Sequence, residues 1–290
     1  MKHVVSTPIQ PIVSKDGRLE VHQVLSWEDN LIWLLVDVNS REVAAVDGPE
    51  AQGVLDYCAS QNLQLTTILN THTHADHIGI NLDLQSRGQL ASMRVVGPKK
   101  RKDDVPGVNE LVDEGSQIFF GESEGTVMLT EGHIDGHISY LFKEFLFCGD
   151  TLFAGGCGYL FDGPPSKMHD SLTRLSKLPK DTLVFCGHEY TEDNLKFAWS
   201  LEPNNFKLRN RIEDVLRIRK AGGCTIPSTI GTELETNPFL RSHNDDVRTK
   251  VLEFAPETNM LIDSQIFAAT RALKDSKMYR SELPVPLPEI

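Results

Sequence analysis

The first half of the chain alternates short hydrophobic runs with polar turn residues. Strands are predicted at 19–26, 31–38 and 42–47, since each run is mostly apolar and the turns Glu28-Asp29-Asn30 and Asn39-Ser40 separate them. Helical spacing over 51–62 follows, and an apolar run over 65–70 then stops at a polar loop rich in histidine. Further strands are expected at 93–96, 117–120, 126–129, 138–142, 145–148 and 182–186, with a helix at 168–178. This mixture predicts a layered α/β core.

The pattern changes after about residue 190. Helical spacing predicts helices at 194–201, 206–220 and 260–274 with no strand between them, and Ala221-Gly222-Gly223 is a helix stop. We therefore expect two domains, an α/β domain at 1–190 and a helical domain at 191–290. Residues 282–290 contain three Pro, which favours an extended, partly ordered tail over a proline-rich recognition motif.

Composition narrows the class of protein. The 290 residues are 40% hydrophobic, enough for a sizeable core, and the formal net charge of -12 repels phosphate backbones, so nucleic acid is not an expected partner. No apolar run is long enough to span a membrane, and the N-terminus has no apolar signal segment. The five Cys form no CxxC pair. Buried thiols in a reducing, cytoplasmic setting are the expectation.

The strongest chemical signal lies directly after the apolar run at 65–70. The segment Thr71-His72-Thr73-His74-Ala75-Asp76-His77 holds three His and one Asp within six positions. Imidazole and carboxylate bind zinc and its first-row neighbours. His72 and His74 are two residues apart and can point the same way on an extended loop, whereas Asp76 and His77 lie where a helix should begin. This divergence suits a second metal ion.

Three further candidate ligands stand after predicted strands, and each is directly preceded by glycine. His133 follows Thr130-Glu131-Gly132, Asp150 follows Cys148-Gly149, and His188 follows Cys186-Gly187. Loops of this kind can converge at one edge of a layered sheet. His137, four residues after His133, is expected to support the ligands, and Cys157 to belong to a tight loop rather than to act as a nucleophile.

These residues resemble the metallo-β-lactamase superfamily through His72-x-His74-x-Asp76-His77 followed by His133, Asp150 and His188. The resemblance narrows to the glyoxalase II group, the hydroxyacylglutathione hydrolases. The segments that carry it are Gly149-Asp150-Thr151-Leu152-Phe153, Gly156-Cys157-Gly158, Gly187-His188-Glu189-Tyr190-Thr191, Asn194-Leu195-Lys196-Phe197-Ala198 and Asn237-Pro238-Phe239-Leu240-Arg241. It implies an αβ/βα sandwich that carries a helical substrate-binding domain.

The resemblance also implies a ligand set and a reaction. One metal would be bound by His72, His74 and His133, the other by Asp76, His77 and His188, and Asp150 would bridge them. The family metals are zinc, iron or manganese, with zinc expected first. A metal-bridging hydroxide would attack the carbonyl of S-D-lactoylglutathione, with Asp76 and Asp150 as the catalytic residues, at the end of methylglyoxal detoxification. The thiolate leaves without a strong general acid.

Four residues match the family's glutathione contacts with some departures. Tyr159 and Phe161 follow the Gly-Cys-Gly turn, where many members have a basic and an aromatic residue. Tyr190 matches a tyrosine that contacts the cysteinyl-glycine portion, and Arg241 matches the binder of the glycine carboxylate. Position 159 is not basic, and a further C-terminal lysine near Arg241 has no counterpart. We therefore expect a raised KM for glutathione thioesters, or another thiol carrier.

Alternative functions use the same ligands. A persulfide dioxygenase needs a single iron held by two His and one carboxylate, which would leave Asp76 and His77 unused. Hydrolysis of β-lactams is disfavoured by the acidic sequence without a signal segment, and phosphodiester cleavage by the net charge. A metal-stabilised binding protein without catalysis would keep the ligands. Two metals per chain would favour the hydrolase over the dioxygenase.

Overall fold

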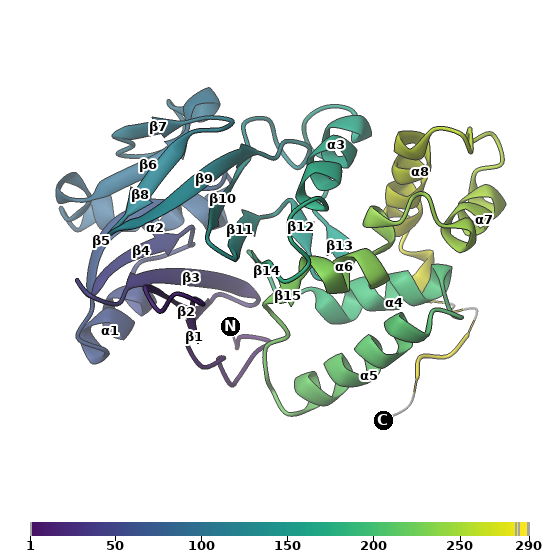
Figure 1. The fold of residues 1–290 in the computed structure, drawn as a ribbon, viewed down its shortest axis with the longest axis horizontal. Helices are drawn as coiled ribbons and strands as arrows, with labels where there is room; N and C mark the ends of the chain where they lie inside the picture. The colour runs from purple at the N-terminus through teal and green to yellow at the C-terminus, as the bar shows by residue number, and fades with distance from the viewer. Residues whose placement is uncertain (1, 282, 284, 289–290) are drawn as a thin grey trace.

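The computed structural model describes residues 2–281, 283 and 285–288, and its framework is a pair of β-sheets packed face to face (Figure 1). The first sheet has seven strands in chain order: β1 (Ile12–Val13), β2 (Leu19–Ser26), β3 (Asn30–Asp37), β4 (Glu42–Val46), β5 (Gln64–Leu69), β6 (Arg94–Pro98) and β7 (Glu110–Val112). The second sheet has the order β15-β14-β11-β10-β9-β8, and β12 and β13 form a separate hairpin. Their bounds are β8 (Gln117–Phe120), β9 (Ser123–Leu129), β10 (Ile138–Phe142), β11 (Phe145–Gly149), β12 (Leu152–Phe153), β13 (Gly156–Cys157), β14 (Leu183–Cys186) and β15 (Ser228–Thr229).

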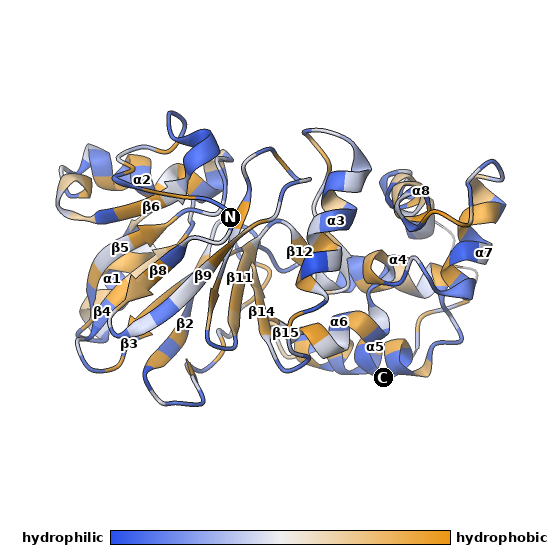
Figure 2. Ribbon diagram, turned by 45° about the horizontal axis from the view of Figure 1, so that its top comes forward, coloured by the Kyte–Doolittle hydropathy of each residue, from blue (hydrophilic) through white to orange (hydrophobic). Residues whose placement is uncertain are grey.

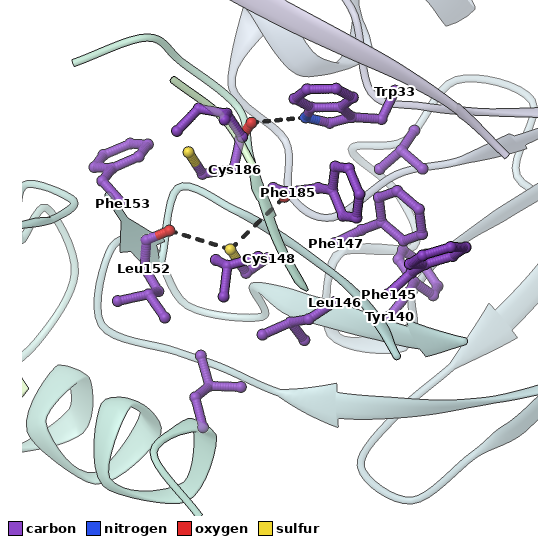
Figure 3. Packing of buried hydrophobic residues seen from close by; sticks show 14 of the residues in the cluster. Trp33, Tyr140, Phe145, Leu146, Phe147, Cys148, Leu152, Phe153, Phe185 and Cys186 are labelled. Carbon is purple, nitrogen blue, oxygen red and sulfur yellow. Dashed lines mark hydrogen bonds between the residues drawn. The ribbon is translucent and has the colours of Figure 1, made fainter. Parts of the chain in front are cut away.

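The core between the sheets contains a cluster of aromatic side chains among many aliphatic ones. Trp33 of β3 packs edge-on against Phe185 of β14, with ring centroids 4.9 Å apart, and Phe147 of β11 stacks on the same ring at 5.3 Å (Figure 3). The indole Nε1 of Trp33 donates to the carbonyl of Cys186 at 2.8 Å. The two sheets are therefore fixed to each other close to the end of β14, where His188 follows.

Helices complete the layers. They are α1 (Gln52–Ser60), α2 (Ala75–Ser86), α3 (Pro165–Leu175), α4 (Thr191–Leu201), α5 (Phe206–Lys220), α6 (Ile230–Thr236), α7 (Asp245–Phe254) and α8 (Asp263–Asp275). On the outer face of the first sheet, Val54 of α1 and Ile80 of α2 pack against Ile32 and Leu34. Figure 2 shows the hydrophobic colour along the strands and blue on many outward turns of the helices. The predicted layered α/β core is confirmed.

The region after residue 190 differs from the prediction. The helices expected at 206–220 and near 194–201 and 260–274 are present, but the expected absence of strands is wrong, because Leu183 and Val184 of β14 pair with Thr229 and Ser228 of β15. This strand has two polar residues and no hydrophobic alternation to reveal it. Two helices, α6 and α7, were also not predicted, since only Val247 and Val251 of α7 are buried among ten residues.

Part of the predicted proline-rich tail, including Pro284, lies outside the described residues. In the described part, Trp199 of α4 donates to the carbonyl of Pro286 at 3.0 Å, and Leu287 packs beside α4 and α5. Among the helices that the structure describes, none is long and apolar enough to cross a membrane.

Candidate metal centre

Two ligands of the histidine-rich segment lie before α2 and two lie in its first turn. The chain leaves β5 at Leu69, and α2 begins at Ala75 with His74 as its N-cap residue. Asp76 therefore stands in the first turn, where a carboxylate is favoured by the helix dipole. The predicted change from extended loop to helix is confirmed. It brings Asp76 and His77 to His188 in a second group, while the rings of His72 and His77 stay 3.9 Å apart.

The first group of facing ligand atoms consists of three imidazoles. His74 Nδ1 lies 3.2 Å from His72 Nε2 and 2.9 Å from His133 Nε2. These three atoms are all within 4.8 Å of one another, and His72 and His133 are buried. His133 reaches the group from the loop after β9, which brings together residues 59 positions apart. The arrangement offers three nitrogen ligands to one cation.

The second group adds a carboxylate. Asp76 Oδ2 lies 3.4 Å from His77 Nε2 and 3.3 Å from His188 Nε2. His188 comes from the loop after β14 and is buried, as is His77. Within the described residues, a third combination joins Asp47 to His72 and His77. Because Asp47 already accepts from His77 Nδ1 and from Thr71, it supports the ligands from behind.

Asp150 lies between the two groups. Its Oδ2 is 3.6 Å from His133 Nε2 and 3.5 Å from His188 Nε2, and its Oδ1 is 3.5 Å from His77 Nε2. Two buried atoms at this point, His77 Nε2 and Asp150 Oδ1, have no hydrogen-bond partner among the described residues. Unpartnered buried polar atoms are rare and call for an ion or water. The donor set fits divalent cations.

The electrostatics of the groups also fit cations. Burial and the neighbouring His77 lower the pKa of His72 well below its usual value, so the imidazole is neutral and its nitrogen lone pair is free to bind. Burial opposes the charged form of Asp150, yet the adjacent His188 and His77 hold its pKa well below the usual range. Asp150 is therefore an anion placed between two sets of imidazoles.

Two glycines make room for this packing. A Cβ on Gly187 would lie 2.7 Å from Asp150 Oδ1 and 2.9 Å from His77 Cε1. A Cβ on Gly158 would lie 2.1 Å from the carbonyl oxygen of Asp150. Any other residue at either position would displace Asp150, so the loop after β14 and the hairpin β12–β13 both depend on glycine next to the cluster.

His137 lies behind the ligands, as expected. Its ring stacks on His72, with centroids 4.6 Å apart, and its Nε2 accepts from the backbone N–H of Asp150 at 3.2 Å. Burial and the neighbouring His133 lower its pKa well below the usual value, which keeps it neutral. His137 holds the backbone of the ligand Asp150.

A cavity of about 490 Å³ opens from the cluster. Aromatic side chains form its walls. The Phe161 ring lies 5.2 Å from both the His74 and His133 rings, and Tyr190 stacks on His188 at 4.8 Å with the planes 2° apart. The structure therefore places Tyr159, Phe161 and Tyr190 around the cavity.

The far end of the cavity is basic. Arg271 and Lys274 of α8 are buried and line it, together with Arg280 from the turn that follows. Lys274 donates to Asn194 Oδ1, and burial, reinforced by Arg271, lowers its pKa to about 7. The guanidinium carbon of Arg271 lies 5.1 Å from the centroid of the Tyr159 ring. Arg271 pairs with Asp275 at 2.5 Å, whereas Lys274 forms no ion pair among the described residues. A buried cation of this kind is suited to bind a carboxylate.

Arg241 is not at this site. Its guanidinium makes an ion pair with Glu202 at 2.7 Å and donates to the carbonyl of Leu234, and it does not line the cavity. The Glu202 carboxylate is fully buried, so it needs this partner. The predicted contact of Arg241 with a substrate carboxylate is corrected accordingly: Arg271 and Lys274 are the basic residues that face the cavity.

Comparison with known proteins identifies the family. The metallo-beta-lactamase superfamily model matches residues 33–188, and the model for the C-terminus of hydroxyacylglutathione hydrolase matches residues 189–277. A hydroxyacylglutathione hydrolase of Synechocystis is 38% identical over 89% of this chain and all of its own length. The Pseudomonas aeruginosa protein of that name is 40% identical over 89% of this chain and 99% of its own.

The chain belongs to the hydroxyacylglutathione hydrolase family. A Synechococcus relative of the same name is 46% identical over 74% of this chain and 85% of its own length. The crystal structure of ETHE1 from Myxococcus xanthus covers 87% of this chain and 98% of its own, with 24% identity and a TM-score of 0.57. That likeness shows the metallo-β-lactamase fold, which confirms the expected fold class.

The histidine and aspartate residues that could hold a divalent metal ion were visible in the sequence. The residues of the basic end were not visible in the sequence. Arg271 and Lys274 are three residues apart, a spacing that places both on one helix face, but Arg and Lys are common at that spacing on exposed helices. Asp29 and Asn30, which contact His188 and Asp76, were read only as turn residues.

Proposed function

We propose that this protein hydrolyses S-(2-hydroxyacyl)glutathione thioesters, converting S-D-lactoylglutathione to D-lactate and glutathione in methylglyoxal detoxification. One observation carries the proposal: a single cavity joins the histidine and aspartate cluster to a basic end formed by Arg271, Lys274 and Arg280. Glutathione has two carboxylates, so its site needs cations at a distance from the reacting carbonyl. The names of the relatives support the same substrate class.

We propose two divalent cations per chain, zinc first, with iron or manganese as alternatives. His72, His74 and His133 would hold one, Asp76, His77 and His188 the other, and Asp150 both. When bound, such ions lower the pKa of water towards neutrality and supply a hydroxide. The second group supports hydrolysis over a dioxygenase with a single iron, which would need only one set of ligands.

The cavity walls position the thioester. Hydrolysis adds the elements of water across the C–S bond, and a thiol with a pKa near 8.5 departs as thiolate without a dedicated acid. Burial holds the pKa of Tyr190 above its usual value, so its hydroxyl stays protonated and can donate to the peptide portion. Phe161 is 63% exposed and covers the first ligand group, where an acyl group would lie.

The basic end binds the carboxylates in this proposal. Arg271 and Lys274 would take the glycine carboxylate, the role that the sequence placed on Arg241. Only position 159 then lacks a cation, since the further C-terminal basic residues are present on α8. We therefore propose glutathione as the thiol carrier, with the KM raised only by the loss of the contact at Tyr159.

Two wider features belong to the proposal. A division into an α/β part and a helical part near residue 190 agrees with the two family models, which meet between residues 188 and 189. A cytoplasmic location agrees with five cysteines that are all buried and unpaired. A substrate of this kind involves neither nucleic acid nor a membrane.

The test is steady-state hydrolysis of S-D-lactoylglutathione with metal content measured on the same sample. Turnover with about two metals per chain is expected. Loss of turnover on chelation and recovery on adding metal would separate an enzyme from a binding protein. Two bound metals without turnover would contradict the substrate and direct the assay to other thioesters, whereas one bound iron would contradict the hydrolase.

A further inference from the structure

The turn between β2 and β3 lies against the second ligand group. Leu31 N–H donates to the carbonyl of Gly187 at 2.8 Å, and Glu189 N–H donates to the carbonyl of Asp29 at 3.1 Å. Asn30 and His188 also form an isolated antiparallel bridge. The backbone thus fixes this turn of the first sheet to the loop after β14 in the second sheet, on both sides of His188.

Two consecutive side chains of the turn contact two ligands of that group. His188 Nδ1 donates to Asp29 Oδ1 at 2.8 Å, and Asn30 Nδ2 donates to Asp76 Oδ2 at 3.0 Å. Asn30 is buried, and its backbone carbonyl accepts from His3 Nε2 at 3.1 Å. The contact with Asp29 fixes the orientation of the His188 ring, with Nε2 3.3 Å from Asp76 Oδ2 and 3.5 Å from Asp150 Oδ2.

The first ligand group has a different kind of support. His72 Nδ1 donates to the hydroxyl of Thr71 at 3.0 Å, and His133 Nδ1 donates to the backbone carbonyl of Tyr159 at 2.8 Å. Both partners are neutral. In the second group, His188 donates to Asp29, and His77 Nδ1 donates to Asp47 at 3.0 Å. Two carboxylates therefore back the second group directly.

We propose that Asp29 and Asn30 set how tightly the second group retains its cation and leave the affinity of the first group unchanged. Asp29 adds a negative charge behind His188 and raises the basicity of its ring, and Asn30 fixes the orientation of the Asp76 carboxylate. Outer contacts of this kind change metal affinity by about 10- to 100-fold. The inference goes beyond the proposed hydrolysis and rests on the proposed two-metal centre.

The experiment is competitive chelation of the zinc-loaded protein, with bound zinc counted by mass spectrometry. In Asp29→Asn, one of the two equivalents should dissociate at a chelator concentration about 10- to 100-fold lower than in the wild type, and the other at the wild-type concentration. Asn30→Ala should weaken the same single equivalent by a smaller factor. Glu28→Gln is the matched control, because it removes the same charge from an exposed position of the same turn and should change neither equivalent.

The outcomes distinguish a specific effect on the second group from no effect and from a general structural role. Two equivalents with wild-type affinity in both Asp29→Asn and Asn30→Ala would overturn the inference. Equal weakening of both equivalents would also overturn it, because it would show a general structural role. Thermal melting shows whether each variant is folded. If Asp29→Asn does not fold, the result for Asn30→Ala alone decides between these outcomes. A wild-type chain that binds fewer than two equivalents contradicts the two-metal centre itself, before any variant is made.

Discussion

The two ends of the cavity are built in different ways. The ligand end gathers residues from the segments that follow β5, β9, β11 and β14, and four of the seven proposed ligands lie between positions 72 and 77. The basic end comes from α8 and the turn after it, with Asn194 of α4 beside Lys274. The ligand end consists mainly of histidine, a rare residue type, at short spacing in the sequence. The basic end consists of arginine and lysine, which are common, and only the tertiary fold brings them to the cavity.

The charges of the two ends are opposite. Asp76 and Asp150 lie at the ligand end, and Arg271, Lys274 and Arg280 at the other. The chain as a whole carries a net charge of -12, so the basic end is a local exception to a negative field. A substrate with a carboxylate at one end and an uncharged reacting carbonyl at the other matches this polarity. The following variants test the two ends separately.

Asp150→Asn should have the largest effect. It removes the carboxylate that lies between the two ligand groups, so we expect kcat to fall by more than about a hundredfold, since outer contacts alone change metal affinity or activity by about 10- to 100-fold. Measured metal content should fall as well. Asp170→Asn, an exposed carboxylate on α3, is the control. Normal kcat with two metals would contradict the placement of Asp150.

Arg241→Met should lower stability rather than substrate binding. Glu202 would be left as a buried, unpaired carboxylate, which costs about 3–5 kcal/mol in the free energy of unfolding. Urea unfolding measures this loss, and the double variant Arg241→Met with Glu202→Leu should recover most of it. A raised KM in a variant of normal stability would restore Arg241 as a substrate contact.

Lys274→Met should act on KM. A charged hydrogen bond to a carboxylate is worth about 1.5–3 kcal/mol, so KM should rise roughly 10- to 100-fold while kcat changes little. Steady-state kinetics with S-D-lactoylglutathione gives both values, and Lys277→Met, an exposed lysine next to α8, is the control. A fall in kcat alone would place Lys274 outside carboxylate binding.

Substrate affinity should fall with rising pH. Burial, reinforced by Arg271, lowers the pKa of Lys274 to about 7, and Cys157, Asp193 and Asp275 are the other titratable groups around it. Below that pH the ammonium is charged and binds a carboxylate. Above it the proton is lost, and binding weakens by up to about tenfold per pH unit. The inhibition constant of S-methylglutathione should therefore rise about tenfold from pH 6 to pH 8. Lys274→Met should flatten this profile.

Arg280→Met should have the smallest effect. Its guanidinium is half exposed and pairs with Asp193 at 2.9 Å at the cavity rim. Exposed pairs contribute about 0–1 kcal/mol, so KM should change by less than about fivefold. A change as large as that of Lys274→Met would show that the rim holds a substrate carboxylate as firmly as the buried end.

The sequence singled out the residues that the structure brings together at the ligand end, for a physical reason. A strand of apolar residues followed at once by His72, His74, Asp76 and His77 has few structural explanations, and hydrophobic alternation located most strands of both sheets. The basic end lacked such a signal. The segment Asn237-Pro238-Phe239-Leu240-Arg241 resembled the family motif, but a motif does not state which partner the arginine meets, and here it meets Glu202.

The same contrast explains the missed elements. β15 is two residues long and is held by the neighbouring β14, so its own sequence carries no strand pattern. α7 buries two side chains and begins with Asn244, whose side chain accepts from the N–H groups of Asp246 and Val247. The Asn244 cap determines where α7 begins, and a search for amphipathic spacing does not detect this helix.

The order of the two ends along the chain has a consequence for synthesis. The last proposed metal ligand is His188, whereas the buried basic residues are Arg271 and Lys274. On the ribosome, the polypeptide leaves the exit tunnel from its N-terminus and folds progressively. Every proposed metal ligand has therefore been translated more than eighty residues before Arg271 and Lys274. A nascent chain at that stage has the proposed ligands but lacks the cations that we propose to bind a carboxylate.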